Sequence, residues 1–362
     1  MIEVDIAIVG AGIAGASVAA AIGDAARVVL IEAESQPGYH STGRSAAFWS
    51  ETYGGPGIQP LTTASGPALR DGGFLDDLGA LHIGRAEDAG TVEAFLADFA
   101  GSGVTLSRVD PADLVPGLRP DWTLGVLEPS CAYIDVGGLH AHLLAVARRA
   151  GAVLMTDATL TGATFVDGGW RIETAAGPVR ARVLVNAAGA WADAVAERAG
   201  VVPIGISAYR RTVAQIRTDP GAPAGMPHVA DIAGRFYFKP EAGGRLWLSP
   251  HDETATDPCD AAPEELDVAI AIDRFEQVVD WRVTAVERRW AGLRSFAPDR
   301  LPVFGFDCAV PGFFWCAGQG GFGIQTAPAA GALCAALILG TAVPEGLDPA
   351  LYAPDRFAPS LD

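Results

Sequence analysis

The first 32 residues constrain the fold more than any other part of the chain. An apolar run over residues 4–9 ends at the glycine-rich sequence GAGIAG, residues 10–15, and an alanine-rich stretch follows it. The run is typical of a buried parallel strand, and the stretch after it of a helix. A second apolar run, residues 28–31, ends at Glu32. This order of elements predicts a dinucleotide-binding βαβ unit.

The glycines and the acid of this unit have separate expected roles. Gly10 makes the tight turn, Gly12 lets the backbone approach a pyrophosphate, and Gly15 lets the helix pack closely on the strand. The helix N-terminus then faces the phosphates, while Glu32 accepts hydrogen bonds from a ribose and repels a 2′-phosphate. We expect cofactor contacts from Gly10, Gly12, Ile13, Ala14, Gly15, Glu32 and Ala33. The motif by itself fits NAD as well as FAD.

Composition and charge argue against several classes of partner. The 362 residues carry a net charge of −18, which repels nucleic acid and anionic lipid. Five cysteines without a CxxC pair indicate a reducing compartment, and the start MIEVD predicts a strand where a signal peptide needs an apolar segment. The apolar run 329–340 is too short to cross a bilayer and predicts a buried helix. We therefore expect a cytoplasmic enzyme with no transmembrane segment and no nucleic-acid partner.

Strand and helix patterns recur further along the chain. Residues 135–151 predict a helix, in which His140 and His142 diverge because they are two positions apart, so we expect no metal site there. Residues 153–174 predict a strand meander. The apolar strand 182–186 then runs into a glycine-containing junction, which is typical of nucleotide contacts at a sheet edge but also of an ordinary βα turn. The cofactor contacts expected there are Ala188, Gly189 and Trp191.

The segment 202–290 differs from the rest, because short alternating runs predict antiparallel strands of a substrate domain. These runs are residues 210–217, 235–238 and 245–248. Near the end, the apolar strand 313–317 precedes a second glycine-rich turn, 318–326, which leads into a helix. Two such helix N-termini, far apart in sequence, suit the two ends of one long cofactor. The pattern therefore favours FAD over NAD.

Six ordered motifs carry a family resemblance over nearly the full length of the chain. They are GAGIAG, PGYHSTGRSAA, VLVNAAGAW, FYFKPEAGG, WAGLRSFAPD and GQGGFGIQT. Together they resemble the D-amino-acid oxidase and dehydrogenase superfamily of flavoproteins, and within it most of all the bacterial D-arginine dehydrogenases. The resemblance implies an α/β fold with a discontinuous Rossmann-like FAD-binding domain plus an α+β substrate domain with an antiparallel sheet. The expected FAD-binding segments are 1–75, 135–203 and 298–362, and the expected substrate-binding segments are 76–134 and 204–297.

The resemblance also implies contacts around the flavin. The positions expected to wrap the flavin are Ser41, Thr42, Arg44, Ser45 and Ala46. The second glycine-rich turn is expected to contribute Gly320, Gly321, Gly323, Ile324 and Gln325. A surface salt bridge is the alternative for Arg44. Related sarcosine-type oxidases tether the flavin through a cysteine that follows their counterpart of WAGLRSF. Here the nearest cysteine is Cys308, so we expect non-covalent FAD and Cys308 in the core.

Two arginines match the family's carboxylate-binding positions, Arg294 in WAGLRSF and Arg211 in YRRT. Oxidation at the α-carbon of an amino acid needs a held carboxylate, a neutral amine and a C–H bond directed at flavin N5. A guanidinium fixes a carboxylate with two parallel bonds, and within an apolar aromatic stretch it requires an anion. The alternative for Arg294 is a structural ion pair. Because a strand alternates faces, only one of Arg210 and Arg211 can face the substrate.

Three further positions complete the expected catalytic set. Tyr53 and Tyr237 match tyrosines near the substrate carboxylate, where a phenol donates a hydrogen bond and its ring closes the site. Their alternative is a role as interfacial core aromatics. Gly321 matches the position that offers a backbone carbonyl to the substrate amine.

The chain departs from D-arginine dehydrogenase at positions that bear on specificity. The acid that binds a cationic side chain falls near Ala80, and the family histidine after SAA is Phe48. We therefore expect a neutral or apolar D-amino acid, with His228 and His82 as further pocket candidates. Trp247 stands near the position of the oxygen-activating lysine of sarcosine-type oxidases, which favours a dehydrogenase.

The expected reaction is oxidation of a D-amino acid to an imino acid, which hydrolyses to a 2-keto acid and ammonia. The electron acceptor is a quinone, another carrier or O2. Two alternatives stay open: a secondary-amine substrate such as an N-alkyl amino acid or an opine, and a non-catalytic flavoprotein subunit that relays electrons.

Overall fold

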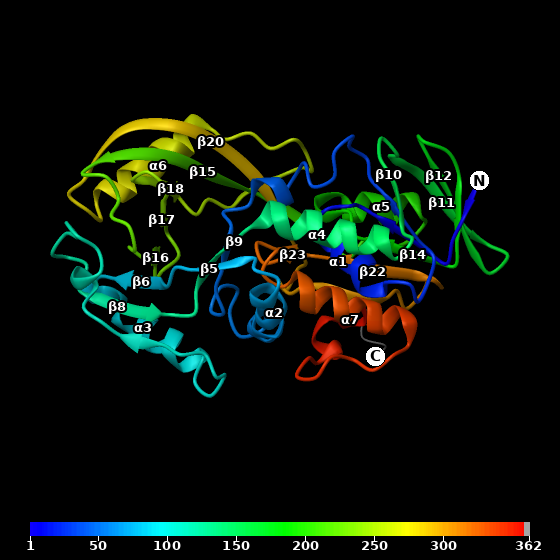
Figure 1. Cartoon of the computed structure of the whole chain (residues 1–362), viewed down its shortest axis with the longest axis horizontal. Coiled ribbons are helices and arrows are strands. Elements are labelled where there is room, and N and C mark those ends of the chain that lie inside the picture. The colour runs from blue at the N-terminus through cyan, green and yellow to red at the C-terminus, as the bar shows by residue number, and fades with distance from the viewer. Residues whose placement is uncertain (358–362) are drawn as a thin grey trace.

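The protein is described by a computed structural model, which defines residues 1–357. Figure 1 shows an elongated molecule in which two sheet-based parts lie side by side. One part carries the N-terminus and the helices α1 (Ile13–Ile22), α4 (Val136–Arg149) and α7 (Ala327–Leu339). Long strands and the helix α6 (Glu265–Glu276) form the other.

A six-stranded sheet forms the centre of the first part. Its order is β10 (Val153–Met155), β3 (Val28–Ile31), β2 (Ile6–Val9), β14 (Val183–Asn186), β22 (Phe313–Ala317) and β21 (Val303–Phe306). The first five strands are parallel, and only the edge strand β21 pairs antiparallel. These strands are continuous apolar runs because both faces of the sheet are covered.

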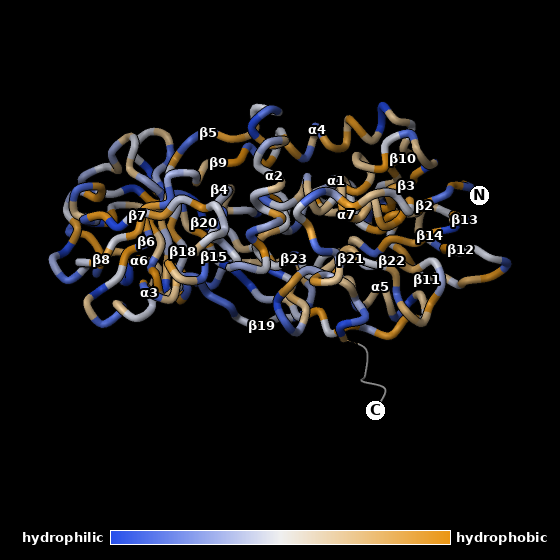
Figure 2. The backbone as a smooth tube through the Cα atoms, turned by 90° about the horizontal axis from the view of Figure 1, so that it is seen from below, coloured by the Kyte–Doolittle hydropathy of each residue, from blue (hydrophilic) through white to orange (hydrophobic). Residues whose placement is uncertain are grey.

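Different elements cover the two faces of this sheet. On one face, α1, α4 and α7 enclose a core that includes Ile8, Leu30 and Phe314. On the other face lies a core with Val9 and Trp315, closed by the helix α5 (Ala192–Arg198) and by a four-stranded sheet. The strands of that sheet are β1 (Ile2–Glu3), β13 (Val179–Ala181), β12 (Gly169–Thr174) and β11 (Leu160–Val166). The apolar, orange segments of Figure 2 gather along these inner elements.

The second part is built on a ten-stranded sheet. Its strands are β23 (Gln319–Gly320), β20 (Arg282–Phe296), β15 (Ser207–Asp219), β18 (Arg245–Ser249), β17 (Tyr237–Glu241), β16 (His228–Asp231), β6 (Ala80–Gly84), β8 (Leu124–Glu128), β7 (Ser107–Arg108) and β19 (Thr254–Thr256). All neighbours are antiparallel except β16 and β6. The 13-residue β15 pairs along its whole length with the 15-residue β20, which makes these two strands the backbone of the sheet.

Alternation along β15 separates two faces. Ala214 and Ile216 pack with Phe275 of α6 in a buried core. Arg211 and Val213 point to the opposite face, where they line a cavity shared with the part that contains the six-stranded sheet. Of the two neighbouring arginines, Arg211 therefore faces inward, whereas Arg210 pairs with acids at the start of α6.

Smaller elements connect the two parts. The strands β4 (Phe48–Trp49), β9 (Ala132–Ile134) and β5 (Leu75–Asp77) form a three-stranded sheet. The helix α2 (Gln59–Asp71) contacts α7 of the first part, whereas α3 (Ala89–Asp98) contacts β8 of the second part. Within residues 1–357, no helix combines the length and the apolarity needed to cross a membrane.

The predicted elements agree with the structure, with one exception. Residues 153–155, expected as part of a strand meander, instead form β10 and pair in parallel with β3. Only β11 and β12 form the expected hairpin. The sequence does not distinguish a strand of a meander from a strand of the parallel sheet, because a short apolar strand has no periodic signal that identifies its partner strand. The domain boundaries stay a prediction, and residues 358–362 of the expected FAD-binding segment 298–362 lie outside the described residues.

Candidate cofactor and substrate site

One cavity of about 540 Å³ runs from the first glycine-rich turn to the inner face of the ten-stranded sheet. The predicted cofactor-binding and catalytic residues line this cavity, except Gly15, whereas the further pocket candidates His82 and His228 do not. The lining joins segments that are more than 300 residues apart, including Gly10 and Gln325. Folding therefore assembles the predicted positions into one continuous space.

The first glycine-rich turn fits tightly between two strands. Gly10 has φ +99°, and a Cβ there would lie 2.4 Å from the carbonyl oxygen of Ala187. A Cβ on Gly15 would lie 1.9 Å from the carbonyl oxygen of Gly10, so Gly15 acts in packing and not in lining the cavity. At Gly12 the nearest atom to a Cβ is Thr42 Oγ1 at 3.2 Å. The first and third glycines are thus required by the fold itself.

Glu32 closes the nucleotide end of the cavity. Its buried carboxylate accepts hydrogen bonds from the backbone N–H groups of Ala11, at 2.8 Å, and Glu34, at 3.0 Å. Both bonds hold the acid beside the glycine-rich turn, at the end of β3. A carboxylate in this place suits the hydroxyl groups of a ribose.

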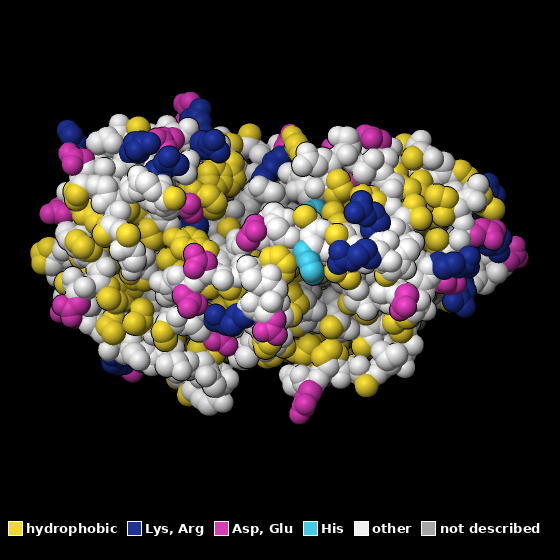
Figure 3. Space-filling view, viewed as in Figure 1, with side chains coloured by type: hydrophobic (Ala, Val, Ile, Leu, Met, Phe, Trp, Pro, Cys, Tyr) yellow, Lys and Arg dark blue, Asp and Glu magenta, His cyan; other side chains and the backbone are white. Residues whose placement is uncertain are grey.

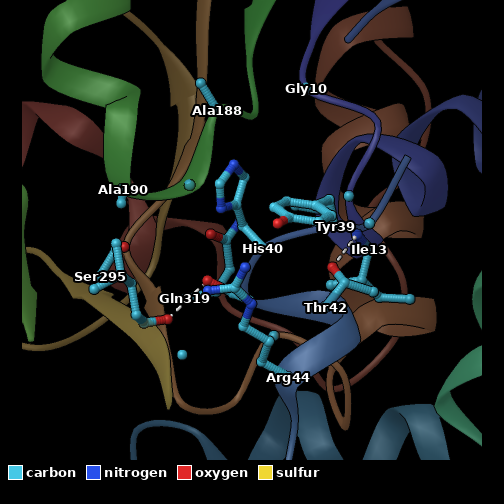
Figure 4. A pocket seen from close by; sticks show the side chains of 18 of the residues that line it. Gly10, Ile13, Tyr39, His40, Thr42, Arg44, Ala188, Ala190, Ser295 and Gln319 are labelled. Carbon is cyan, nitrogen blue, oxygen red and sulfur yellow. Dashed lines mark hydrogen bonds between the residues drawn. The ribbon is translucent and has the colours of Figure 1, made fainter. Parts of the chain in front are cut away.

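Most residues of the segment 39–45 line the cavity. Thr42 Oγ1 accepts a hydrogen bond of 3.0 Å from the N–H of Ile13, the first residue of α1 (Figure 4). Figure 4 also shows Tyr39, His40 and Arg44 between Gly10 on one side and Ala188 on the other. This segment therefore contacts the cofactor helix and forms part of the cavity wall.

Arg44 lines the cavity and is also paired with an acid. Its guanidinium forms an ion pair with Asp260 and donates a hydrogen bond of 2.9 Å to the carbonyl of Ala261. Tyr39 donates to the same Asp260 at 3.2 Å. Tyr39, His40 and Asp260 were not predicted as site residues, because polar residues in a loop carry no periodic signal.

Polar groups without partners gather at the other end of the cavity. The Tyr53 hydroxyl, the Tyr237 hydroxyl and Arg211 Nη1 are buried and form no hydrogen bond within residues 1–357. The guanidinium of Arg294, which is half-buried beside them, has no hydrogen-bond or ion-pair partner within residues 1–357. Buried donors of this kind are normally satisfied. We call these four side chains the carboxylate hole.

The rest of the Arg211 side chain is firmly held. Its Nε donates to the carbonyl of Asp252 at 2.6 Å, and its Nη2 pairs with Glu253 at 3.0 Å. Burial, together with the nearby positive charge of Arg294, lowers the pKa of Arg211 to about 10. Burial also raises the pKa of Tyr237 above its ordinary value, so this phenol stays protonated and can donate.

Gly321 leaves space for the carboxylate hole. A Cβ at this position would lie 2.5 Å from the Tyr53 hydroxyl and 3.0 Å from the Arg294 guanidinium. Arg294 in turn lies over the Tyr53 ring, with 5.7 Å between its Cζ and the ring centroid. Any side chain at Gly321 would displace one of these two groups.

The two histidines expected in the pocket lie one layer behind it. His228 stacks its ring on Phe48, at 4.6 Å, and on Tyr237, at 5.4 Å, but it does not line the cavity. His82 contacts Thr52 Oγ1 at 3.3 Å, and it does not line the cavity either. The expectation that they line the pocket was wrong, because Phe48, Tyr237 and Thr52 pack against their rings.

The buried Lys239 lies near Trp247, the residue expected near the position of the oxygen-activating lysine of sarcosine-type oxidases. Lys239 Nζ stands 4.0 Å from the ring centroid of Trp247 and is 1% exposed. Its ammonium group pairs with Glu241, and the residue does not line the cavity. The sequence argument did not single out this lysine, which lies on the strand next to that of Trp247.

Cys308 and His140 both lie outside the cavity lining. Cys308 is exposed and was wrongly expected in the core, because it lies in the turn between β21 and β22 and not in a strand. His140 packs under the first glycine-rich turn and contacts the carbonyl oxygen of Ala11 at 2.8 Å. Within the described chain, no group of three or more potential ligands is placed to hold a metal ion.

The residues present fit FAD. The turn at Gly12 and the N-terminus of α1 offer N–H groups and open space to a pyrophosphate, and Glu32 offers a carboxylate to the ribose beside it. The cavity then continues past Trp191 to the second glycine-rich turn, where Gly320 and Ile324 line it. A single elongated cofactor therefore has contacts at both ends and along its middle.

Comparisons with known proteins agree with this assignment. Hydrogen cyanide synthase subunit HcnC of Pseudomonas aeruginosa is 28% identical over 65% of this chain and 55% of its own length. The chain thus spans about half of that relative. L-proline dehydrogenase from P. horikoshii superposes with a TM-score of 0.86 and 21% identity over 98% of both chains. Glycine oxidase from Geobacillus kaustophilus superposes with a TM-score of 0.83 and 23% identity over 98% of both chains.

At these identities the two structures show a shared fold, an α/β cofactor part joined to a large, mainly antiparallel substrate sheet. None of the three proteins is a D-arginine dehydrogenase, so that finer likeness stays a prediction. The family model described as "DAO: FAD dependent oxidoreductase" matches residues 5–337. The chain therefore belongs to the DAO family of FAD-dependent oxidoreductases, and its cofactor is FAD.

Proposed function

We propose that this protein oxidises a D-amino acid with a neutral or apolar side chain to the imino acid, which water converts to a 2-keto acid and ammonia. The observation that carries the proposal is the carboxylate hole. Tyr53, Arg211, Tyr237 and Arg294 come from separate segments and present unpartnered polar groups to one cavity. Such a cluster is costly to bury unless a ligand satisfies it.

A substrate carboxylate matches this cluster in charge and geometry. Within residues 1–357 Arg294 has no competing partner and can donate two parallel bonds, while Nη1 of Arg211 is still free to donate. A charge-assisted bond contributes roughly 1.5 to 3 kcal/mol, so loss of either arginine is expected to be severe. The two phenols add donors and close the site with their rings.

Holding the carboxylate would fix the position and orientation of the α-carbon. FAD would supply the hydride acceptor when bound. The carboxylate hole would orient the α-C–H bond of the substrate for transfer of a hydride, and the amine lone pair would form the C=N bond as the hydride leaves. The Gly321 carbonyl is the proposed acceptor for the substrate N–H. No other residue need take a proton in this step if the amine enters neutral.

The charges around the cavity support a substrate without a cationic side chain. The acidic residues that line it are Glu32, Glu34 and Asp260. Glu32 and Glu34 belong to the nucleotide end, and Asp260 is paired with Arg44. Phe48 instead presents a ring beside Tyr53, with 5.0 Å between the centroids, at the substrate end. An apolar side chain is therefore the better match.

Two alternatives share the same cofactor. An N-alkyl amino acid or other secondary amine also carries a carboxylate, and L-proline, which the P. horikoshii protein is named for, is a cyclic secondary amine. A subunit that only relays electrons is the second alternative, since the relative HcnC is named as a subunit. The preference for D-amino acids rests on the motif resemblance described above.

Anaerobic mixing with a panel of D-, L- and N-methyl amino acids tests the proposal. We expect D-amino acids with small or apolar side chains to bleach the flavin absorbance. Bleaching by N-methyl amino acids alone would favour the secondary-amine alternative. If no amine bleaches the flavin, oxidation of amino acids is ruled out and the electron-relay alternative gains support.

A second measurement addresses the electron acceptor, which is a quinone, another carrier or O2. Lys239 is paired and lies outside the cavity lining, so we propose slow reaction with O2 and dehydrogenase activity. Reoxidation of the reduced enzyme should be faster with a soluble quinone than with air-saturated buffer. Equal rates would identify an oxidase.

A further inference from the structure

A fully buried carboxylate lies behind the substrate end of the cavity. Glu128, the last residue of β8, is 0% exposed. Its Oε2 accepts hydrogen bonds from Ser50 Oγ at 2.8 Å and Thr52 Oγ1 at 2.6 Å, and its Oε1 accepts one from the backbone N–H of Glu51 at 2.7 Å. All three donors belong to the segment that immediately precedes Tyr53.

These bonds are strong because they end on a charge. Burial acts to raise the pKa of Glu128, but the His82 ring, 3.7 Å from Oε2, and the hydrogen bonds from Thr52 and Ser50 outweigh it and hold the pKa below its usual value. The carboxylate is therefore ionised in the fold. An ionised acid that is completely buried binds its donors tightly, since an unsatisfied charge is costly.

The same segment is held from its other side by Gln325. Its Nε2 donates to the carbonyl of Tyr53 at 3.0 Å and to Thr62 Oγ1 at 2.9 Å, while its Oε1 accepts from the N–H of Ser50 at 3.3 Å. The side chain of Gln325 is thus occupied by protein contacts, although the residue borders the cavity at the second glycine-rich turn.

Glu128 does not replace the missing acid near Ala80, even though the two residues are paired across β6 and β8. Its carboxylate is saturated by residues 50–52, and neither Glu128 nor Thr52 lines the cavity. Any effect of this acid on the substrate must therefore pass through the segment that it binds.

We infer that Glu128 and Gln325 form a two-sided cradle that fixes the Tyr53 hydroxyl in the carboxylate hole. The cradle consists of these two residues and the segment 50–53. Both are positioning residues, since they hold the backbone that carries Tyr53 and leave substrate contact to Tyr53 itself. The inference rests on the proposed function for the role of Tyr53, whereas the anchoring can be tested apart from it.

The variant Thr52→Val tests the cradle with little change in shape, because it removes one donor to Glu128 and keeps the branched side chain. Ser130→Ala is the matched control: Ser130 Oγ contacts the same carboxylate at 3.4 Å, but Ser130 lies outside the segment 50–53. The probe is propionate, a carboxylate without an oxidisable amine, and its binding to the FAD-loaded enzyme is followed by the flavin spectrum.

We expect Thr52→Val to weaken propionate binding about tenfold and Ser130→Ala to leave it unchanged. Amide hydrogen exchange over residues 50–53 should accelerate in Thr52→Val only. Adding Tyr53→Phe provides the decisive comparison, since Thr52→Val should have no further effect on propionate binding in that background. An equal loss with and without Tyr53→Phe would overturn the inference.

The outcomes also separate the inference from the proposed function. If the wild-type enzyme does not bind propionate, the carboxylate hole is wrong, and hydrogen exchange still decides whether the cradle exists. If propionate binds but Thr52→Val and Ser130→Ala behave alike in both measurements, the cradle is wrong and the carboxylate hole stands.

Discussion

At the scale of single residues, the site is defined by donors that the fold leaves without partners. Arg211 is held by Asp252 and Glu253 so that only Nη1 is free, whereas Arg294 is free throughout the described chain. One arginine is therefore rigid, and the other can adapt to the ligand. Together they form a cationic site in a molecule whose net charge of −18 opposes the approach of anions.

Arg294→Leu should remove the main contact to the carboxylate. Loss of one charge-assisted bond alone, roughly 1.5 kcal/mol, weakens propionate binding about tenfold, and loss of two weakens it further. Arg289→Leu is the matched control, because it lies on the same strand with its side chain 48% exposed. Propionate titration of both FAD-loaded variants measures the effect. Equal affinity in the two variants would remove Arg294 from the site.

The lowered pKa of Arg211 predicts that carboxylate binding is sensitive to alkaline pH. The guanidinium carries its charge below its pKa of about 10 and loses it above. Propionate affinity should therefore fall as pH rises through this value. The Arg211→Met variant should bind propionate more weakly at neutral pH, and its propionate affinity should not fall as pH rises through about 10. A fall of equal size in the variant would assign the transition to another group, such as a phenol.

At the scale of elements, the most informative units are the two glycine-rich turns at the C-terminal ends of β2 and β22. Both were predicted from sequence, since each consists of an apolar strand, a glycine cluster and a helix in order. The parallel strands place the turn at Gly10 beside Ala187 of the β14 junction. The long pair β15 and β20 places Arg211 and Arg294 on one face of the second sheet.

The glycines of the first turn should respond differently to a methyl group. In Gly12→Ala the nearest atom is the Thr42 hydroxyl at 3.2 Å, so the fold is expected to persist while the pyrophosphate loses its approach. In Gly15→Ala the methyl group would meet the Gly10 carbonyl at 1.9 Å, which should unfold or displace α1. FAD affinity and apoprotein melting temperature separate the two effects. A lower melting temperature in Gly12→Ala than in Gly15→Ala would contradict this account.

His228 on β16 should make the fold sensitive to acid. Burial, with His82 and Lys239 nearby, lowers the pKa of His228 to about 3, whereas a histidine in the unfolded chain has a pKa of about 6.5. Between these values only the unfolded state binds the proton, so stability falls as pH decreases. His228→Phe should reduce this slope in urea unfolding. Exposed His142→Phe is the control and should not change it.

At the scale of the whole molecule, two sheet-based parts enclose one cofactor cavity. Figure 3 shows acidic and basic side chains dispersed over the visible face, with apolar atoms between them. The candidate site residues lie inside, where the first part supplies the nucleotide end and the second part supplies Arg211, Tyr237 and Arg294 of the carboxylate hole. Neither part holds the complete set of site residues.

The sequence predicted local patterns well and their spatial partners poorly. Continuous apolar runs on either side of a glycine-rich turn and an alanine-rich stretch identified β2, β3 and α1, and the motif resemblance identified Arg294 and Tyr53 as site candidates. Neither signal showed that β10 joins the parallel sheet, that Glu128 binds the segment before Tyr53, or that Asp260 pairs with Arg44. These contacts depend on distant loops and strands meeting in space, for which a single sequence has no signal.

The central claim is that the carboxylate hole selects an amino acid by its carboxylate and presents its α-carbon to the flavin. The most direct test is the anaerobic rate of flavin reduction by an active amino acid from the panel and by its carboxamide, which has the same amine and side chain but no charge. This account predicts at least about a hundredfold slower reduction by the amide, as loss of two charge-assisted bonds implies. Equal rates for the acid and the amide would contradict it.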